Sequence, residues 1–187
     1  MGLRNWIFEG QEEAADEAAR LRDEAKERPD RADVTRLVEI YHEAYSAETV
    51  RRAVDGLEFV AGHHPDRLSG VMGDIIDGTT VYEGHAKDFR RDLAEVVESA
   101  AEIRSGLIRG QESRIVSALE SEFALERATS KYPAALDQQK VRALCRALVQ
   151  SKTDDARDAL ETIRHEAPPD VRMYVWTAID DLDADAV

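Results

Sequence analysis

Histidines are the residues of this sequence with the most versatile chemistry, because imidazole binds metals and titrates near neutral pH. Two of the five precede a glutamate, in His42-Glu43 and His165-Glu166, and His63-His64 adjoins a proline. A zinc or metalloprotease-type site takes clustered cysteines or two histidines one helical turn apart. Neither arrangement occurs here, so we expect no metal ligands and no cofactor.

The single cysteine, Cys145, is the other candidate for chemistry. It lies between Leu144 and Leu148 on an apolar helical pattern, so we expect it to pack as a small hydrophobic residue without a disulfide partner. A Gly-x-Ser-x-Gly nucleophile motif and a glycine-rich phosphate loop with its lysine are both absent. The sequence therefore offers no catalytic residue, and the unpaired thiol fits a reducing, cytoplasmic location.

The elements that would position these residues are helices. Val50, Val54, Leu57 and Ala61 follow helical spacing and predict a helix that faces the preceding one across a turn at Ser46. Similar spacing predicts helices from about residue 4 or 11 to 27, and over 86–104, 111–131, 137–150, 153–165 and 168–179. Strand-like alternation is missing, so we expect an all-α fold.

Polar residues mark the expected starts of several helices. Asp30, Asp66, Asp137 and Thr153 each precede a predicted helix and are expected to act as N-caps. The helix after Asp66 would contain Gly70 and Gly73, and two glycines in so short a helix predict close packing of a neighbouring element.

A dipeptide repeat then suggests the architecture. An apolar residue followed by arginine opens four predicted helices, at Val50-Arg51, Phe89-Arg90, Val141-Arg142 and Val171-Arg172, separated by 39, 52 and 30 residues. The pattern resembles the HEAT-repeat family, whose second helix commonly begins Val-Arg after an acidic turn. The resemblance implies a short HEAT-like α-solenoid of antiparallel helix pairs with an N-terminal cap helix; an irregular helical bundle is the alternative.

The resemblance divides the chain into a helical segment over 1–29, a repeat domain over 30–182 and an acidic tail over 183–187, with fraying expected from Asp180 onward. It also implies that Arg51, Arg90, Arg142 and Arg172 pair with upstream acids, which here are Glu48, Asp88, Asp137 and Asp170.

Six residues are candidates for binding. Trp6 and Phe8 would either cap the end of the array or anchor a partner. Tyr82 lies in a predicted loop bracketed by Gly78 and Gly84, and such loops often carry function. In such solenoids the second helices line the concave side, and the arginines that they would present there include Arg52, Arg91 and Arg146.

Composition restricts the partners. The chain of 187 residues has 39 acidic and 25 basic side chains, a net charge of -14, and only five lysines among the basic residues. That charge repels nucleic acid and anionic membranes, so neither is expected as a partner. The balance resembles the cytoplasmic proteins of halophilic archaea. An apolar run long enough for membrane insertion is also absent.

We therefore expect a non-enzymatic scaffold that presents a curved helical surface to another protein. The alternative is a HEAT-like enzyme. One possibility is similar to the deoxyhypusine hydroxylases, which bind two irons through His-Glu pairs. The other is similar to the alkylpurine DNA glycosylases, which hold a duplex on a basic concave face.

Overall fold

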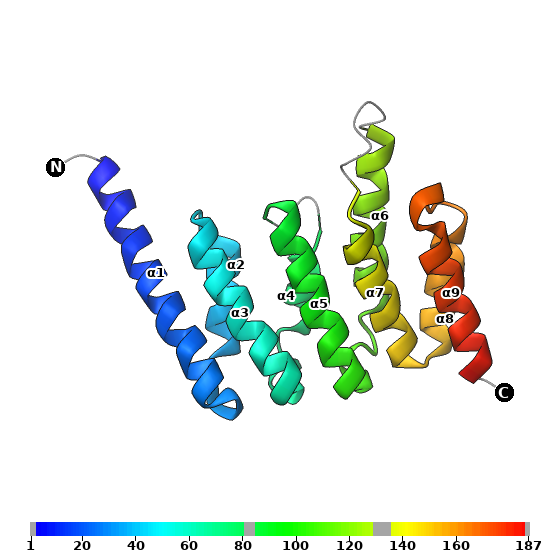
Figure 1. The fold of residues 1–187 in the computed structure, drawn as a ribbon, viewed down its shortest axis with the longest axis horizontal. Coiled ribbons are helices and arrows are strands. Elements are labelled where there is room, and N and C mark those ends of the chain that lie inside the picture. The colour runs from blue at the N-terminus through cyan, green and yellow to red at the C-terminus, as the bar shows by residue number, and fades with distance from the viewer. Residues whose placement is uncertain (1–2, 81–84, 129–135, 186–187) are drawn as a thin grey trace.

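The structure, a computed structural model, consists of helices joined by turns (Figure 1). It describes residues 3–80, 85–128 and 136–185, with side chains over 12–80, 85–125 and 136–184. Its α-helices are α1 (Leu3–Glu27), α2 (Val34–Glu43), α3 (Ala47–His63), α4 (Met72–Asp77), α5 (Lys87–Ile103), α6 (Glu112–Ala128), α7 (Gln138–Ser151), α8 (Asp154–Arg164) and α9 (Pro169–Asp185). Three short 3-10 turns are η1 (Pro29–Arg31), η2 (Pro65–Leu68) and η3 (Ser105–Leu107). No strand occurs in the described ranges, which confirms the all-α prediction for them.

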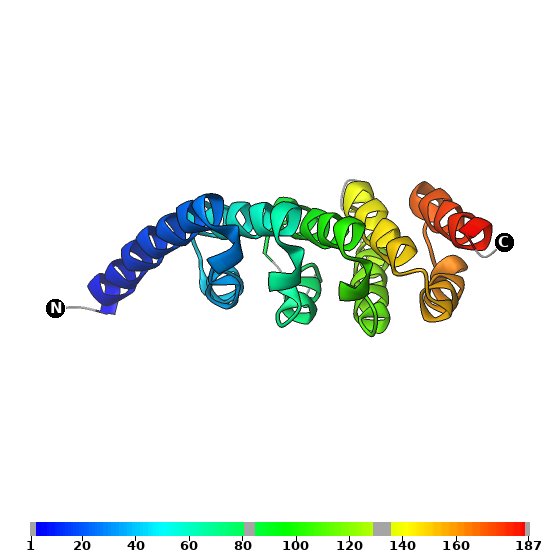
Figure 2. The same cartoon turned by 90° about the horizontal axis from the view of Figure 1, so that it is seen from below.

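The helices form two rows. In Figure 1, α1, α3, α5, α7 and α9 lie side by side in chain order, and each packs against the next. Figure 2 shows α2, α4, α6 and α8 as the second row. Contacts between α2 and α3, α4 and α5, α6 and α7, and α8 and α9 join the rows.

Apolar side chains fill the space between the rows. The predicted stripe of α3, Val50, Val54, Leu57 and Ala61, is at most 2% exposed. The same holds for the α7 residues predicted to face inward, which are Val141, Leu144, Cys145 and Leu148. These residues belong to one continuous core that extends from α1 to α9. Because each large aliphatic side chain contributes about 1.5–3 kcal/mol when buried, this core holds the rows together.

Two of the predicted N-caps are confirmed. The Asp137 carboxylate accepts the backbone N–H groups of Gln139 and Lys140, both at 3.1 Å, at the start of α7. The Thr153 hydroxyl accepts the N–H of Ala156 at 3.1 Å at the start of α8. Each bond satisfies an amide that has no partner within its helix.

The predicted caps Asp30 and Asp66 are wrong. Each follows a proline at the first position of a 3-10 turn, and the aspartate is part of that turn, η1 or η2. The cap of α2 is instead Asp33, whose carboxylate accepts the N–H of Arg36 at 3.0 Å. The fixed backbone angle of proline starts a tight turn here and delays the helix.

The prediction of close packing holds for Gly73 but not for Gly70. A Cβ atom on Gly73, in α4, would lie 3.1 Å from the guanidinium carbon of Arg114. Gly70 lies in the turn before α4, and an added Cβ would have no neighbour within 4 Å.

The predicted fraying from Asp180 is wrong as far as residue 185, because α9 continues to Asp185. Leu182 remains buried against the core, and the Arg157 guanidinium of α8 donates to the Asp183 carboxylate at 2.6 Å. These two contacts hold the final turns of α9 in place.

Candidate functional site

A groove lies between α7 and α9 and has a volume of about 290 Å³. We call it the α7–α9 groove. Its lining from α7 is Arg142, Cys145, Arg146 and Val149, and its lining from α9 is Met173, Tyr174, Thr177, Ala178 and Asp181. The groove therefore contains apolar surface together with positively and negatively charged side chains.

Helical periodicity explains why these residues share one hollow. The lining positions recur every three or four residues along each helix, which places them along one edge of α7 and one edge of α9. On α9, Val171 and Val175 face the core and are fully buried. Met173 consequently points away from the core and is 68% exposed.

The charged part of the groove is carried mainly by α7. Arg146 forms an ion pair with Glu98 of α5 at 3.0 Å, and the Arg146 side chain remains 55% exposed. Arg142 is exposed and has no ion pair with any residue whose side chain the structure describes. Asp181 stands on the opposite helix. One arginine is thus free to meet an external carboxylate, and a second is partly compensated.

Cys145 contributes apolar surface to the floor. Its side chain is 1% exposed, and burial raises the pKa of the thiol to about 12. The thiol therefore stays neutral at physiological pH and lacks the thiolate form that reacts as a nucleophile. This agrees with its predicted role as a small hydrophobic residue.

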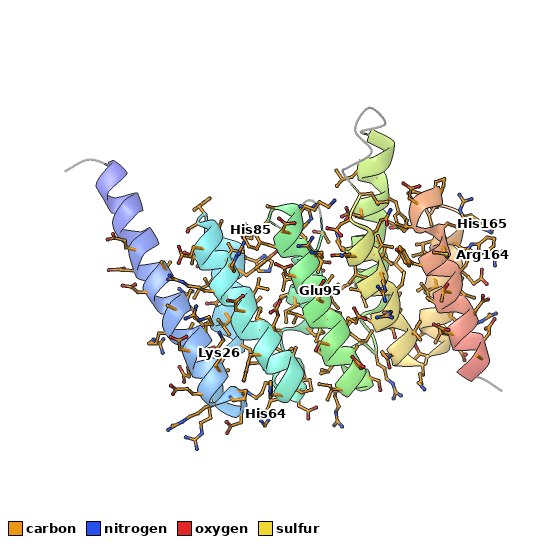
Figure 3. The ribbon with its side chains drawn as sticks, in the orientation of Figure 1. Lys26, His64, His85, Glu95, Arg164 and His165 are labelled. Atoms are coloured by element: carbon orange, nitrogen blue, oxygen red, sulfur yellow. The ribbon has the colours of Figure 1, made fainter. Side chains whose placement is uncertain are left out.

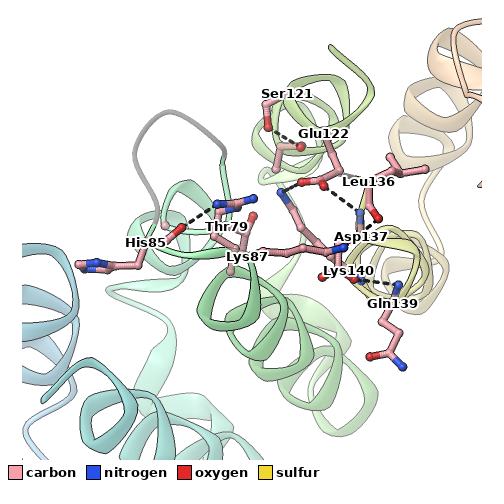
Figure 4. A network of polar contacts seen from close by, with 12 residues as sticks. Thr79, His85, Lys87, Ser121, Glu122, Leu136, Asp137, Gln139 and Lys140 are labelled. Atoms are coloured by element: carbon pink, nitrogen blue, oxygen red, sulfur yellow. Dashed lines mark hydrogen bonds and ion pairs between the residues drawn. The ribbon is translucent and has the colours of Figure 1, made fainter. Parts of the chain in front are cut away.

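A buried ionic network fixes the N-terminal end of α7 (Figure 4). Lys140 donates to Glu122 of α6 at 2.9 Å, and both side chains are 0% exposed. The second oxygen of Glu122 accepts the backbone N–H of Asp137 at 2.9 Å. Burial lowers the pKa of Lys140, and the adjacent Glu122 opposes that shift. The network sets the position of α7 and hence of one wall of the groove.

Two further cations of α5 bind backbone carbonyls around this network. Lys87 donates to the carbonyl of Leu136 at 3.1 Å, and Arg90 donates to the carbonyl of His85 at 2.7 Å. The Lys87 bond connects α5 to the segment before α7, and the Arg90 bond holds a residue just before α5 itself. Neither cation lines the α7–α9 groove.

The expected pairing of the repeated arginines is wrong. Among the described side chains, the acids Glu48 and Asp88 pair with the following arginines, Arg52 and Arg91, because these lie one helical turn away. Arg90 and Arg172 instead bind the carbonyl five residues earlier, that of His85 or Ala167. Arg51 lies over the Phe89 ring at 5.9 Å.

The three arginines predicted to bind a ligand are not gathered in one site. Arg52 of α3 donates to the carbonyl of Ala15 at 2.9 Å and pairs with a carboxylate of its own helix. Arg91 of α5 lies between Asp88 and Asp92, at 3.3 and 3.5 Å. Only Arg146 lines the α7–α9 groove. Local carboxylates therefore neutralise most of the positive charge expected on this face.

The aromatic candidates cannot be placed. The backbone of Trp6 and Phe8 belongs to α1, but their side chains lie outside the described residues, as does the whole of Tyr82. Their roles as a cap or as docking residues stay predictions.

The histidines do not form one cluster, although the rings of His42 and His85 both pack against the Tyr41 ring, at 5.2 and 4.9 Å between centroids. Figure 3 labels His64, His85 and His165, which lie in widely separated parts of the molecule. His42 Nε2 lies 3.3 Å from the carbonyl oxygen of Asp74, and a His85 ring nitrogen contacts the carbonyl of Tyr41. Among the described residues, no group of three His, Cys, Asp or Glu side chains has a metal-binding arrangement.

Carboxylates crowd the surface between α3 and α5. Partial removal from water, and to a smaller extent the nearby carboxylates of Asp55, Asp92 and Glu95, together raise the pKa of Glu58 to about 7. The pKa values of Asp92 and Glu95 are also raised, chiefly by burial. This part of the row therefore carries a cluster of carboxyl groups, whereas the α7 wall of the α7–α9 groove carries arginines.

Other hollows have different linings. The hollow between α6 and α8 has a larger volume, about 570 Å³. It is lined by Glu112, Ser113, Val116, Ser117, Asp155, Asp158, Ala159 and Thr162. It contains carboxylates and hydroxyls but no cation. The α7–α9 groove is thus the better match to a surface that binds protein, where Met, Tyr and Arg are enriched.

Searches of protein-family models, curated proteins and solved structures found no match to this chain. In the described ranges, no helix combines the length and apolarity needed to cross a membrane.

Sequence reasoning missed two parts of this site. The helical pattern of α9 places Val171 and Ala178 inward, so the outward position of Met173 could have been predicted from the same pattern. The burial of Lys140 in an ion pair could not be predicted from the helical pattern. Lys140 falls on the apolar stripe four residues before Leu144, but only the fold reveals that Glu122 lies opposite.

Proposed function

We propose that this chain is a non-enzymatic scaffold that binds another protein. The observation that carries the proposal is the α7–α9 groove, which combines an apolar floor, an exposed Met173 and Arg142, which has no ion pair with a described side chain. Such a combination is suited to recognising apolar and anionic groups together.

We also propose that the two rows of helices are a HEAT-like α-solenoid of antiparallel pairs. The packing of each odd-numbered helix on the next and of α2 on α3 and α8 on α9 supports this. In this arrangement α1 covers the exposed end of the first pair, the role that an N-terminal cap has in repeat arrays. The repeated arginines that bind carbonyls before α5 and α9 support a recurring unit.

The charge distribution supports a protein partner in preference to nucleic acid. The net charge is -14, and local acids compensate Arg52 and Arg91. A duplex needs several uncompensated cations to displace its counterions. A protein segment needs far fewer, so Arg142, which is unpaired among the described side chains, is sufficient.

Affinity capture tests the scaffold proposal. The tagged chain would be incubated with an extract of its source cells in molar KCl, and captured protein, nucleic acid and metal would be quantified. We expect one protein in stoichiometric amount, which is then purified and titrated against the purified chain. Trp6→Ala/Phe8→Ala is included to determine whether the N-terminal segment contributes.

Two outcomes would contradict the proposal. One is the absence of any protein that binds the purified chain in solution. The other is the capture of stoichiometric metal or of nucleic acid without a protein, which would favour an enzyme related to the hydroxylases or the glycosylases.

A further inference from the structure

We infer that the α7–α9 groove binds an amphipathic α-helix of the partner, whose acidic edge lies against α7. This inference rests on the proposed function and specifies its partner. It follows from the length of the groove, from the backbone hydrogen bonds within its two helices and from the positions of its charged side chains.

The groove has the length of two helical turns. Its walls run from Arg142 to Val149 and from Met173 to Asp181, which is seven or eight residues along each helix. At 1.5 Å per residue this corresponds to about 11 Å, or about two turns. A helix lying along the groove can therefore insert side chains from positions i, i+3 or i+4, and i+7.

The walls favour a helix over an extended peptide. Peptides that bind as strands pair with free backbone N–H and C=O groups on a sheet edge. The backbone groups of α7 and α9 beside the groove lie within helices and bond along their own axes. An occupant must satisfy its own backbone, and a helix does so.

The apolar contacts suit a row of aliphatic side chains. Val149 and Ala178 line the groove, together with the thioether of Met173 and the ring of Tyr174 on α9. Methionine adapts to partners of different shape, and tyrosine supplies a large contact area with few rotatable bonds. Together they can enclose leucine-sized side chains.

The charges fix the orientation of the occupant. Arg142 and Arg146 are one helical turn apart on α7, so acids spaced by four residues on the occupant can face both. Asp181 on α9 calls for a basic residue at the opposite edge. A helix with this pattern has little net charge, so the net charge of -14 does not prevent its approach.

Fluorescence anisotropy with three synthetic peptides tests the inference. Each labelled peptide has about 14 residues and carries lysines along one edge of its helix. The first has a leucine stripe at helical spacing and glutamates along the other edge, the second has the same stripe with lysines there as well, and the third has the composition of the first with the leucines scattered. We expect the full-length chain to bind the glutamate peptide about tenfold more tightly than either of the others in 0.2 M KCl.

Matched variants localise the binding. Met173→Asp should weaken the glutamate peptide about tenfold, because it removes the apolar wall and repels the acidic edge. Ile103→Asp makes the same change at a residue of similar exposure on α5, outside the groove, and should leave affinity unchanged. Arg142→Glu/Arg146→Glu should reverse the preference in favour of the lysine peptide.

The inference is overturned if the glutamate peptide does not bind, if all three peptides bind equally, or if Met173→Asp and Ile103→Asp have equal effects. Its failure is distinguishable from failure of the scaffold proposal. A captured partner that binds the purified wild-type chain and Met173→Asp equally well would leave the scaffold in place and exclude this groove.

Discussion

Lys140 Nζ donates to Glu122 Oε2 at 2.9 Å in the core, with both side chains fully buried (Figure 4). Removing two charges from water costs several kcal/mol each, and the attraction between them offsets that cost only while both are present. The two residues therefore depend on each other, and they tie α6 to α7.

Lys140→Met should destabilise the chain by about 3–5 kcal/mol, because it leaves the Glu122 carboxylate buried without its cation. The free energy of unfolding, measured by urea titration with circular dichroism in high salt, checks this. In Lys140→Met/Glu122→Gln both charges of this buried pair are removed, while the glutamine oxygen can still accept the N–H of Asp137. We expect the double variant to recover about 2 kcal/mol or more, and a double variant as unstable as the single one would contradict the pairing.

Gly78→Ala should destabilise the chain by about 1–3 kcal/mol through overpacking. The new Cβ would lie 2.9 Å from the Tyr41 ring and 3.0 Å from Leu93, and the Tyr41 hydroxyl already donates to the Gly78 carbonyl at 2.9 Å. Gly62→Ala is the matched control, since nothing lies within 4 Å of its added Cβ in α3, and it should stabilise by about 0.5–1 kcal/mol. Thermal unfolding of both variants is sufficient, and a loss of stability no larger in Gly78→Ala than in Gly62→Ala would refute this packing.

Most of the fold could be predicted from the sequence, because local signals agree with the final packing. Apolar spacing located the inward faces of α3 and α7, and Asp137 and Thr153 marked helix starts. The errors arose where local and tertiary effects compete. Because a proline begins each 3-10 turn, Asp30 and Asp66 belong to those turns and do not cap an α-helix. Contacts with α8 and the core stabilise the acidic end of α9 as helix.

Glu58→Gln should stabilise the chain more at pH 8 than at pH 4.5. Desolvation and nearby acids raise the pKa of Glu58 from 4.5 to about 7, so the folded state favours its protonated form. The stability that this provides is complete below pH 4.5 and is lost as the pH rises through 7. Glutamine mimics the neutral form and removes the loss.

Unfolding free energies of the wild type and Glu58→Gln across pH 4.5–8 check this prediction. Glu102→Gln removes an exposed carboxylate from α5 and controls for the general reduction of negative charge. If the two variants show the same pH dependence, the prediction for Glu58 is wrong.

Salt should stabilise the chain, because its net charge of -14 creates repulsion that ions screen. Between 0.05 and 2 M KCl we expect a gain of about 2 kcal/mol, which corresponds to a rise in Tm of about 4–8 °C for a chain of this length. Sucrose at equal osmolality controls for effects other than screening. An unchanged helical signal and Tm in dilute buffer would argue against the halophilic interpretation of the composition.

The candidate site was less predictable than the fold. Arg146, Arg52 and Arg91 were all predicted from their positions on second helices. Arg146 lines the groove, whereas Arg52 and Arg91 form ion pairs with acids of their own helices. A helical pattern shows which residues point outward. It does not show which of them face a neighbouring helix across a groove. Arg142 of α7 and Met173 of α9 line the same groove, and only the packing of the two helices reveals this.

The most direct test of the account is a calorimetric titration of the purified captured partner into the wild-type chain, Met173→Asp and Ile103→Asp. We predict one-to-one binding to the wild type, an unchanged Kd for Ile103→Asp and about tenfold weaker binding to Met173→Asp. Equal affinity for all three proteins would contradict the claim that the partner docks in the α7–α9 groove.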